Sequence, residues 1–260
     1  MIGFLVKKTF FDLWDNMFRI VLVNLGFIVS LGITVLLPEL ISLTPLSIAV
    51  RIIGIQWCCV YLAATALSVK AISDYGSFGF ADFFRNLKAG LPAGMVLGLA
   101  ALFLFIMARF TIPFYWTMDS IFGWITGGII VWTLALSLVS FQFFCAIRAR
   151  LDTKPLKIIK KCFIIFFDNT GFSLFTFLYT VVTLALSLML ALLLPGPAGL
   201  LLFLDEALRL RLLKYDWLEE NPPAENTPKR RVIPWDVLLI EERDRTGTRT
   251  FRNFIFPWKE

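Results

Sequence analysis

Side chains that commonly carry catalysis or bind metals are scarce in this 260-residue sequence. It contains no histidine, the commonest general base and metal ligand. Motifs of serine hydrolases, phosphate-binding loops, dinucleotide-binding folds and zinc proteases are missing as well. The four cysteines stand in apolar surroundings without a C-x-x-C spacing, and we interpret them as buried small hydrophobic residues: Cys58, Cys59, Cys145 and Cys162. The sequence therefore predicts no enzyme and no cofactor or metal.

Polar side chains within long apolar stretches are the remaining candidates for a site. Because a charge inside a bilayer is costly, such residues often mark a solute path. Arg51 and Arg109 stand near the ends of apolar stretches, where we favour snorkelling to lipid headgroups over an outward-facing gate. For Gln56, in the middle of a stretch, we favour a hydrogen bond between helices over a ligand-binding role. The candidate intramembrane polar site consists of Arg51, Gln56, Arg109 and Asp205.

Asp205 leaves two alternatives open. If the Pro195-Gly196-Pro197 turn reaches the outer interface, Asp205 lies about 12 Å below it by helical rise and needs a partner or a wet cavity. If the turn is itself sunk into the membrane, Asp205 and Glu206 mark the cytoplasmic end of the segment.

The elements that must position these residues follow from composition. The chain is 58% hydrophobic and 17% charged, with a mean hydropathy of +0.78. A soluble domain carries about 25% charged residues, and a disordered one is poor in apolar residues. The composition therefore predicts an integral membrane protein.

Five uncharged windows are long enough to cross a bilayer, which takes about 20 residues of helix. Because the windows are continuously apolar rather than alternating, we expect helices and not a β-barrel. We divide the last window into a fifth span, Asn169–Leu194, and a returning segment, Ala198–Leu204, that is either a short sixth span or a half-helix. The predicted fold is an all-α polytopic transmembrane bundle of about six spans, the last one short. The windows are Ile20–Leu37, Ile52–Val69, Ala89–Ala108, Ser120–Ile147 and Asn169–Leu204.

The distribution of basic residues predicts the topology. All but two of the 25 Lys and Arg residues fall on one side of these spans, the exceptions being Arg51 and Arg109. Under the positive-inside rule both termini are expected in the cytoplasm, which favours six crossings over five. The N-terminal apolar run has no cleavage site and is expected to remain as the first span.

Amphipathic helices are expected on the cytoplasmic face before spans one, three and five, near Phe4–Trp14, Phe80–Lys88 and Pro155–Phe163. The basic residues around the last of them could bind anionic lipid or an acidic partner, although we favour a role in topology alone. These residues are Arg148, Arg150, Lys157, Lys160 and Lys161.

The character of the chain changes after Tyr215. We therefore divide it into a transmembrane helical domain, residues 1–215, and a cytoplasmic tail, residues 216–260, that begins with a linker at Asn221–Pro228. The tail interleaves basic and aromatic residues, which suits docking to a membrane or a partner; folding back on the protein's own cytoplasmic face is equally compatible. No nucleic-acid-binding motif is present, so no nucleic acid is expected. The candidate contact residues are Trp235, Arg249, Phe251, Arg252, Phe254, Phe256 and Trp258.

Three short motifs mark the membrane part: ADFFRNLK at 81–88, KIIKK at 157–161, and GPA at 196–198, which opens a short last helix ending near Tyr215. In these motifs and in its layout over roughly the first 215 residues, the chain resembles the YesL-like family of small bacterial membrane proteins. The resemblance implies an accessory of carbohydrate utilisation, often associated with sugar ABC transporters, and no catalytic residues. The tail lies outside it.

We expect a non-enzymatic inner-membrane protein that acts as an accessory or scaffold beside a solute uptake system. Its expected partners are the lipid bilayer, with anionic lipid at the cytoplasmic face, and an ABC-transporter permease or another membrane protein. The alternative is a small-solute transporter or channel that uses Asp205, Gln56 and Arg51 along a polar path. A membrane enzyme is a third hypothesis.

Overall fold

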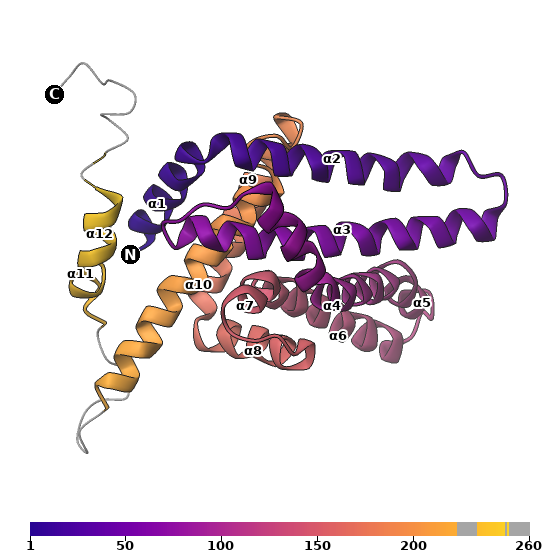
Figure 1. The fold of residues 1–260 in the computed structure, drawn as a ribbon. Helices are drawn as coiled ribbons and strands as arrows, with labels where there is room; N and C mark the ends of the chain where they lie inside the picture. The colour runs from indigo at the N-terminus through magenta and orange to yellow at the C-terminus, as the bar shows by residue number, and fades with distance from the viewer. Residues whose placement is uncertain (223–232, 248, 250–260) are drawn as a thin grey trace.

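The computed structural model describes residues 1–222, 233–247 and 249, and every regular element among them is a helix (Figure 1). The predicted all-α class is thereby confirmed. The elements are α1 (Ile2–Asp15), α2 (Met17–Glu39), α3 (Thr44–Ser73), α4 (Phe80–Ile106), the π-helical turn η1 (Met107–Thr111), α5 (Ile112–Trp116), α6 (Ile121–Phe141), α7 (Phe144–Arg150), α8 (Pro155–Asp168), α9 (Thr170–Met189), α10 (Gly196–Glu220), α11 (Trp235–Leu238) and α12 (Ile240–Thr246).

Five helical stretches of the described chain are long and apolar enough to cross a membrane, with mean hydropathies between 1.8 and 2.6. Large apolar side chains cover their outer surfaces, as at Leu36 and Ile121. Water would not tolerate so much exposed apolar area, whereas lipid does. These features are those of a multi-pass membrane protein. The five stretches are Met17–Glu39, Thr44–Ser73, Phe80–Trp116, Ile121–Arg150 and Thr170–Met189.

Helices α2, α3 and α4 pack closely because small residues line their contacts. α2 and α3 form the long hairpin of Figure 1, and the Tyr61 hydroxyl donates to the Val23 carbonyl across it at 2.8 Å. On α4, Gly90, Gly94 and Gly98 recur every four residues and face α3. A Cβ at Gly94 would lie 2.4 Å from the Cα of Val60, so only glycine permits this approach.

Helices α9 and α10 form an antiparallel hairpin whose turn meets α2 at Asn24. The Asn24 side chain accepts from the amide of Ala198 and donates to the carbonyls of Leu193 and Pro195, each at 2.9 Å. It thereby satisfies the Ala198 amide and the Leu193 carbonyl, and it adds a second donor to the Pro195 carbonyl, which also accepts from the Gly199 amide. Asn24 lies 15 residues before Glu39, the last residue of α2, which is about 22 Å of helix.

The turn before α10 therefore lies within the length of α2, about 10 Å from its first residue, Met17, and about 22 Å from its last. Of the two alternatives for the returning segment, the structure has the half-helix. The prediction of about six spans, the last one short, becomes five membrane-length helices in the described chain and a return along α10 from a turn within the length of α2.

The expected amphipathic segments are all helical, in two forms. α1 contains Phe4–Trp14 and α8 contains Pro155–Phe163, each as a separate helix. Phe80–Lys88 instead forms the first turns of α4, which continues through Pro92 into the span.

Candidate functional site

Charged and polar side chains from five parts of the chain meet where α3 ends. We call this group the α3-end cluster. The end of a helix carries partial negative charge on its last carbonyls, which favours cations there. α1, α7, α10 and α12 each bring charged side chains to this point. The members of the cluster are Lys8, Thr9, Asp12, Ser73, Asp74, Tyr75, Arg150, Asp205, Glu206, Arg209 and Glu242.

Arg150 and Asp205 form a buried ion pair, with side chains 9% and 0% exposed. Arg150 Nε donates to Asp205 Oδ1 at 2.9 Å, and Nη2 donates to Oδ2 of the same carboxylate. The guanidinium also reaches Asp74 Oδ1 at 3.0 Å and the Ser73 hydroxyl at 2.9 Å. Burial raises the pKa of Asp205 and the arginine opposes that rise. Asp205 thus lies at the basic end of the bundle, as the alternative with a sunken turn predicts, and it has a charged partner there.

Lys8 joins α1 to α10 in the same cluster. Its ammonium pairs with Asp12, one turn along α1, and lies 3.4 Å from Glu206 Oε1. It also donates to the Ser73 carbonyl at 3.1 Å, while the Thr9 hydroxyl donates to Glu206. Burial raises the pKa of Glu206 well above its usual range, although Lys8 opposes the rise. Glu206 is therefore a fully buried carboxyl whose charged form is costly.

Arg209 and Tyr75 hold the carboxylate of Glu242, which comes from α12. Arg209 Nη2 donates to Glu242 Oε1 and the Tyr75 hydroxyl donates to Oε2, both at 2.6 Å. The Tyr75 ring lies near three cationic groups: Lys8 Nζ at 4.3 Å, the Arg209 guanidinium at 5.3 Å and that of Arg245 at 5.6 Å from its centroid. Burial, and then the bond to Glu242, raise the pKa of the Tyr75 hydroxyl.

The described part of the tail therefore folds back on the protein itself. Leu239 is fully buried in the apolar core, and Trp235 packs against that core. Arg249 pairs with Asp15 of α1 at 2.7 Å, and α12 lies beside the N-terminus in Figure 1. Five predicted contact residues lie outside the described residues: Phe251, Arg252, Phe254, Phe256 and Trp258.

A second polar group ties the base of α9 to α10. The Arg211 guanidinium is buried, lies 3.6 Å from the Phe172 ring centroid and donates to Asn169 Oδ1 at 3.3 Å. Burial lowers the pKa of Arg211 to about 10. Lys214 donates to Asp168 at 3.0 Å nearby. These contacts fix the α9–α10 hairpin at the end opposite its turn.

The other members of the predicted polar site are placed far from Asp205. Arg51 pairs with Glu39 at 2.6 Å on an exposed surface. It stands 22 residues before Ser73 on the same helix, about 33 Å away. Arg109 is exposed on η1, with its guanidinium 5.8 Å from the Phe110 ring centroid.

Gln56 is buried between α3 and α4, where its amide faces the Met95 carbonyl at 3.2 Å and the Leu99 amide at 3.3 Å. Gly98 leaves the space that it occupies. The structure thus brings none of Arg51, Gln56 and Arg109 together with Asp205. The four candidate residues stand at separate places, and a role for any of them in binding a solute stays a prediction.

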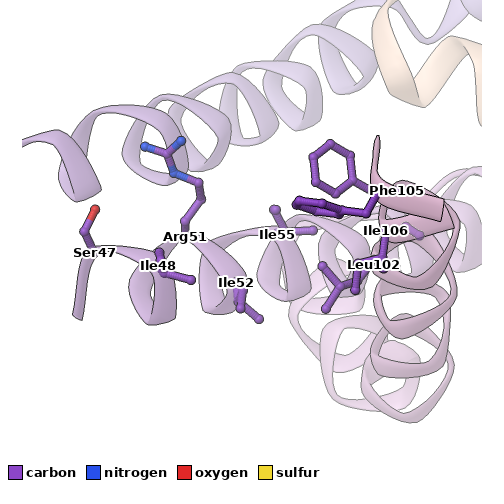
Figure 2. A pocket seen from close by; sticks show the side chains of 10 residues that line it. Ser47, Ile48, Arg51, Ile52, Ile55, Leu102, Phe105 and Ile106 are labelled. Carbon is purple, nitrogen blue, oxygen red and sulfur yellow. The ribbon is translucent and has the colours of Figure 1, made fainter. Parts of the chain in front are cut away.

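A large cavity beside α3 has an apolar lining. Figure 2 shows Ser47 and Arg51 at one end of this space of about 540 Å³ and hydrophobic side chains along the rest. Such a lining suits an acyl chain and offers no polar path across the bundle. Within the described ranges no group of three or more Cys, Asp or Glu residues is placed to hold a metal ion. The lining residues are Ser47, Ile48, Arg51, Ile52, Ile55, Ala101, Leu102, Phe105, Ile106 and Phe110.

The basic residues around α8 divide into two sets. Arg148 donates to the Ala89 carbonyl at 2.9 Å, Lys161 lies 3.4 Å from Asp152, and Arg150 belongs to the α3-end cluster. Lys157 and Lys160 are exposed. Contact of these two lysines with lipid or a partner stays a prediction.

Sequence reasoning missed most of the α3-end cluster. The distribution of basic residues predicts only a topological role for Lys8 and Arg209, and no role for Asp74 and Glu242. A signal was present, since Lys8–Asp12 and Asp205–Arg209 are opposite charges four residues apart, each pair within one predicted helical segment. Asn24 has no comparable signal.

Comparison with protein-family models, with curated proteins and with solved structures found no match to this chain.

Proposed function

We propose that this protein is a non-enzymatic, multi-pass inner-membrane protein that acts as an accessory or scaffold subunit beside a solute-uptake system. The observation that carries the proposal is the α3-end cluster. It uses most of the buried charge of the described chain in contacts between the protein's own helices. Little charge remains that could bind or conduct a solute.

The cluster suits a rigid platform. Breaking a buried ion pair leaves an uncompensated charge and costs about 3–5 kcal/mol. Arg150 joins α7 to α3 and α10, while Lys8 joins α1 to the same two helices. Elements joined in this way resist the relative movement that alternating access in a transporter requires. A fixed arrangement of helix ends favours a docking role.

The orientation we propose puts the α3-end cluster in the cytoplasm. The basic residues that predict a cytoplasmic side belong to the same loops and helix ends that form the cluster. The start of α10 returns the chain toward that end from a turn within the length of α2, so both termini are proposed to be cytoplasmic.

The link to solute uptake rests on the resemblance to the YesL-like family, which implies a sugar ABC transporter as the neighbour. The exposed Lys157 and Lys160 on α8 supply positive charge for anionic lipid or for a permease loop at that face.

The competing hypothesis of a transporter needs a continuous polar path. Asp205, Gln56 and Arg51 occupy separate places in the described structure, each with protein partners of its own. No observation therefore favours transport by this chain alone.

The test combines uptake in cells with purification in mild detergent. In a deletion strain, sugar uptake should fall and the wild-type gene should restore it, with permease subunits recovered alongside the tagged protein. The Arg150→Met variant should restore uptake less well than the control Arg85→Met, because Arg85 forms an exposed pair with Asp82. Unchanged uptake in the deletion strain, or solute transport by the protein alone in liposomes, would refute the scaffold role.

A further inference from the structure

The Glu242 carboxylate occupies a site that the rest of the protein builds. Only 7% of this residue is exposed, yet it comes from a short segment, α11–α12, that follows residues 223–232, which lie outside the described chain. Both donors to its carboxylate, Arg209 and Tyr75, belong to the membrane domain. The arrangement is that of a ligand and a receptor within one chain.

The receptor side is held in place independently of Glu242. Arg209 uses its other terminal nitrogen, Nη1, on the Ser73 carbonyl and on Asp74 at 3.3 Å. Tyr75 has a backbone φ of +61°, in the left-handed region that a bulky residue rarely adopts, so its position is imposed by its surroundings. Without Glu242, one guanidinium nitrogen and one hydroxyl would remain as two convergent donors for a carboxylate.

The site also has an apolar half. Leu239 is fully buried and belongs to the same apolar core as Leu208 and Leu5, while Glu242 follows it three residues later. The receptor therefore recognises two side chains of one helical turn, an apolar one and an acidic one.

Trp235 packs against the same apolar core, with the Arg211 guanidinium 5.6 Å from its ring centroid, while the remaining polar contacts of the segment are weak. Lys7 donates to the Gly247 carbonyl at 3.3 Å, and the Arg249–Asp15 pair is exposed, so each adds little stability. Val237 and Ile240 point away from the core and are more than half exposed. The tail is thus held mainly by three side chains: Leu239, Glu242 and Trp235.

We propose that Tyr75, Arg209 and the socket of Leu239 form a binding site for an acidic helical peptide of a partner protein, and that residues 233–247 occupy it as a displaceable intramolecular ligand. The partner segment would carry an apolar residue followed three residues later by Glu or Asp. This proposal rests on the scaffold function, because it identifies the surface through which the scaffold meets its partner.

A fluorescent peptide with the sequence of residues 233–247 tests the proposal on the full chain in nanodiscs. In the wild type the tethered copy holds the site at high effective concentration, so the free peptide should bind weakly. A released variant, with Leu239→Asp and Glu242→Gln, should bind it about tenfold or more tightly. Adding Arg209→Gln to the released variant should abolish that gain. Equal binding by the wild type and the released variant would overturn the proposal.

Amide hydrogen exchange on the full chain gives a second measurement that does not depend on the peptide. Glu242→Gln should speed exchange in residues 235–247 about tenfold or more and leave α2 and α3 unchanged. The control Glu241→Gln, at an exposed neighbour, should change neither region. Unchanged exchange in the Glu242→Gln tail, or faster exchange throughout the chain, would count against a displaceable ligand.

These outcomes separate the two proposals. If the released variant binds the peptide but deletion of the gene leaves sugar uptake unchanged, the peptide site stands and the uptake function fails. If uptake depends on the gene but no variant binds the peptide, the uptake function stands and the peptide site fails.

Discussion

Replacing Arg150 by methionine should destabilise the protein by about 3–5 kcal/mol, because it leaves the fully buried Asp205 without its cation. Methionine keeps the unbranched apolar stem, so the change isolates the guanidinium. Asp205→Asn should cost less, about 1–3 kcal/mol, since Arg150 keeps its contacts with Asp74 and Ser73. The two substitutions together should cost less than their sum, because neither then leaves an unpaired charge.

The matched control is Arg85→Met. Arg85 pairs with Asp82 at 2.7 Å, similar in length to the buried pair, but its side chain is 77% exposed. Exposed pairs contribute about 0–1 kcal/mol. The free energy of unfolding can be measured by titrating SDS into mixed micelles. If Arg150→Met costs no more than Arg85→Met, burial does not govern the strength of these pairs and the argument for a rigid platform is refuted.

Three further predictions concern packing and charge elsewhere. The pKa of Glu206 is raised in the folded state, so the wild-type free energy of unfolding should fall as pH rises from about 4.5, the ordinary pKa, toward the higher pKa of the folded state. Melting curves across pH should show a weaker dependence for Glu206→Gln. Gly94→Ala should cost about 1–3 kcal/mol through its contact with Val60, whereas Gly128→Ala, with open space around it, should be near neutral in the same titration. Asn24→Leu should cost about 2 kcal/mol or more and speed amide exchange at the start of α10, because it leaves buried backbone groups unpaired.

The membrane-length helices could be predicted because their signal is local. An uncharged apolar window must be a helix in lipid, so the windows around Ile20–Leu37 and Ile52–Val69 became α2 and α3 with modest shifts at their ends. The asymmetry of basic residues is likewise a property of composition and needs no knowledge of packing.

The α3-end cluster could not be predicted in the same way because it joins distant residues. Lys8 and Glu206 are 198 positions apart, and no local pattern selects one carboxylate as the partner of one cation. The position of Asp205 depended on the depth of the turn before α10. That depth is set by Asn24, a single polar residue in an apolar helix, whose partners in the turn are backbone groups without a sequence signature.

The side of the membrane on which α10 ends can be read from two single cysteines. The four native cysteines are buried, so added ones at Leu40, between α2 and α3, and at Glu219, near the end of α10, can be labelled selectively. With a maleimide that does not cross membranes, Leu40→Cys should react in intact cells and Glu219→Cys only after the membrane is opened. Labelling of Glu219→Cys in intact cells would contradict a cytoplasmic α3-end cluster.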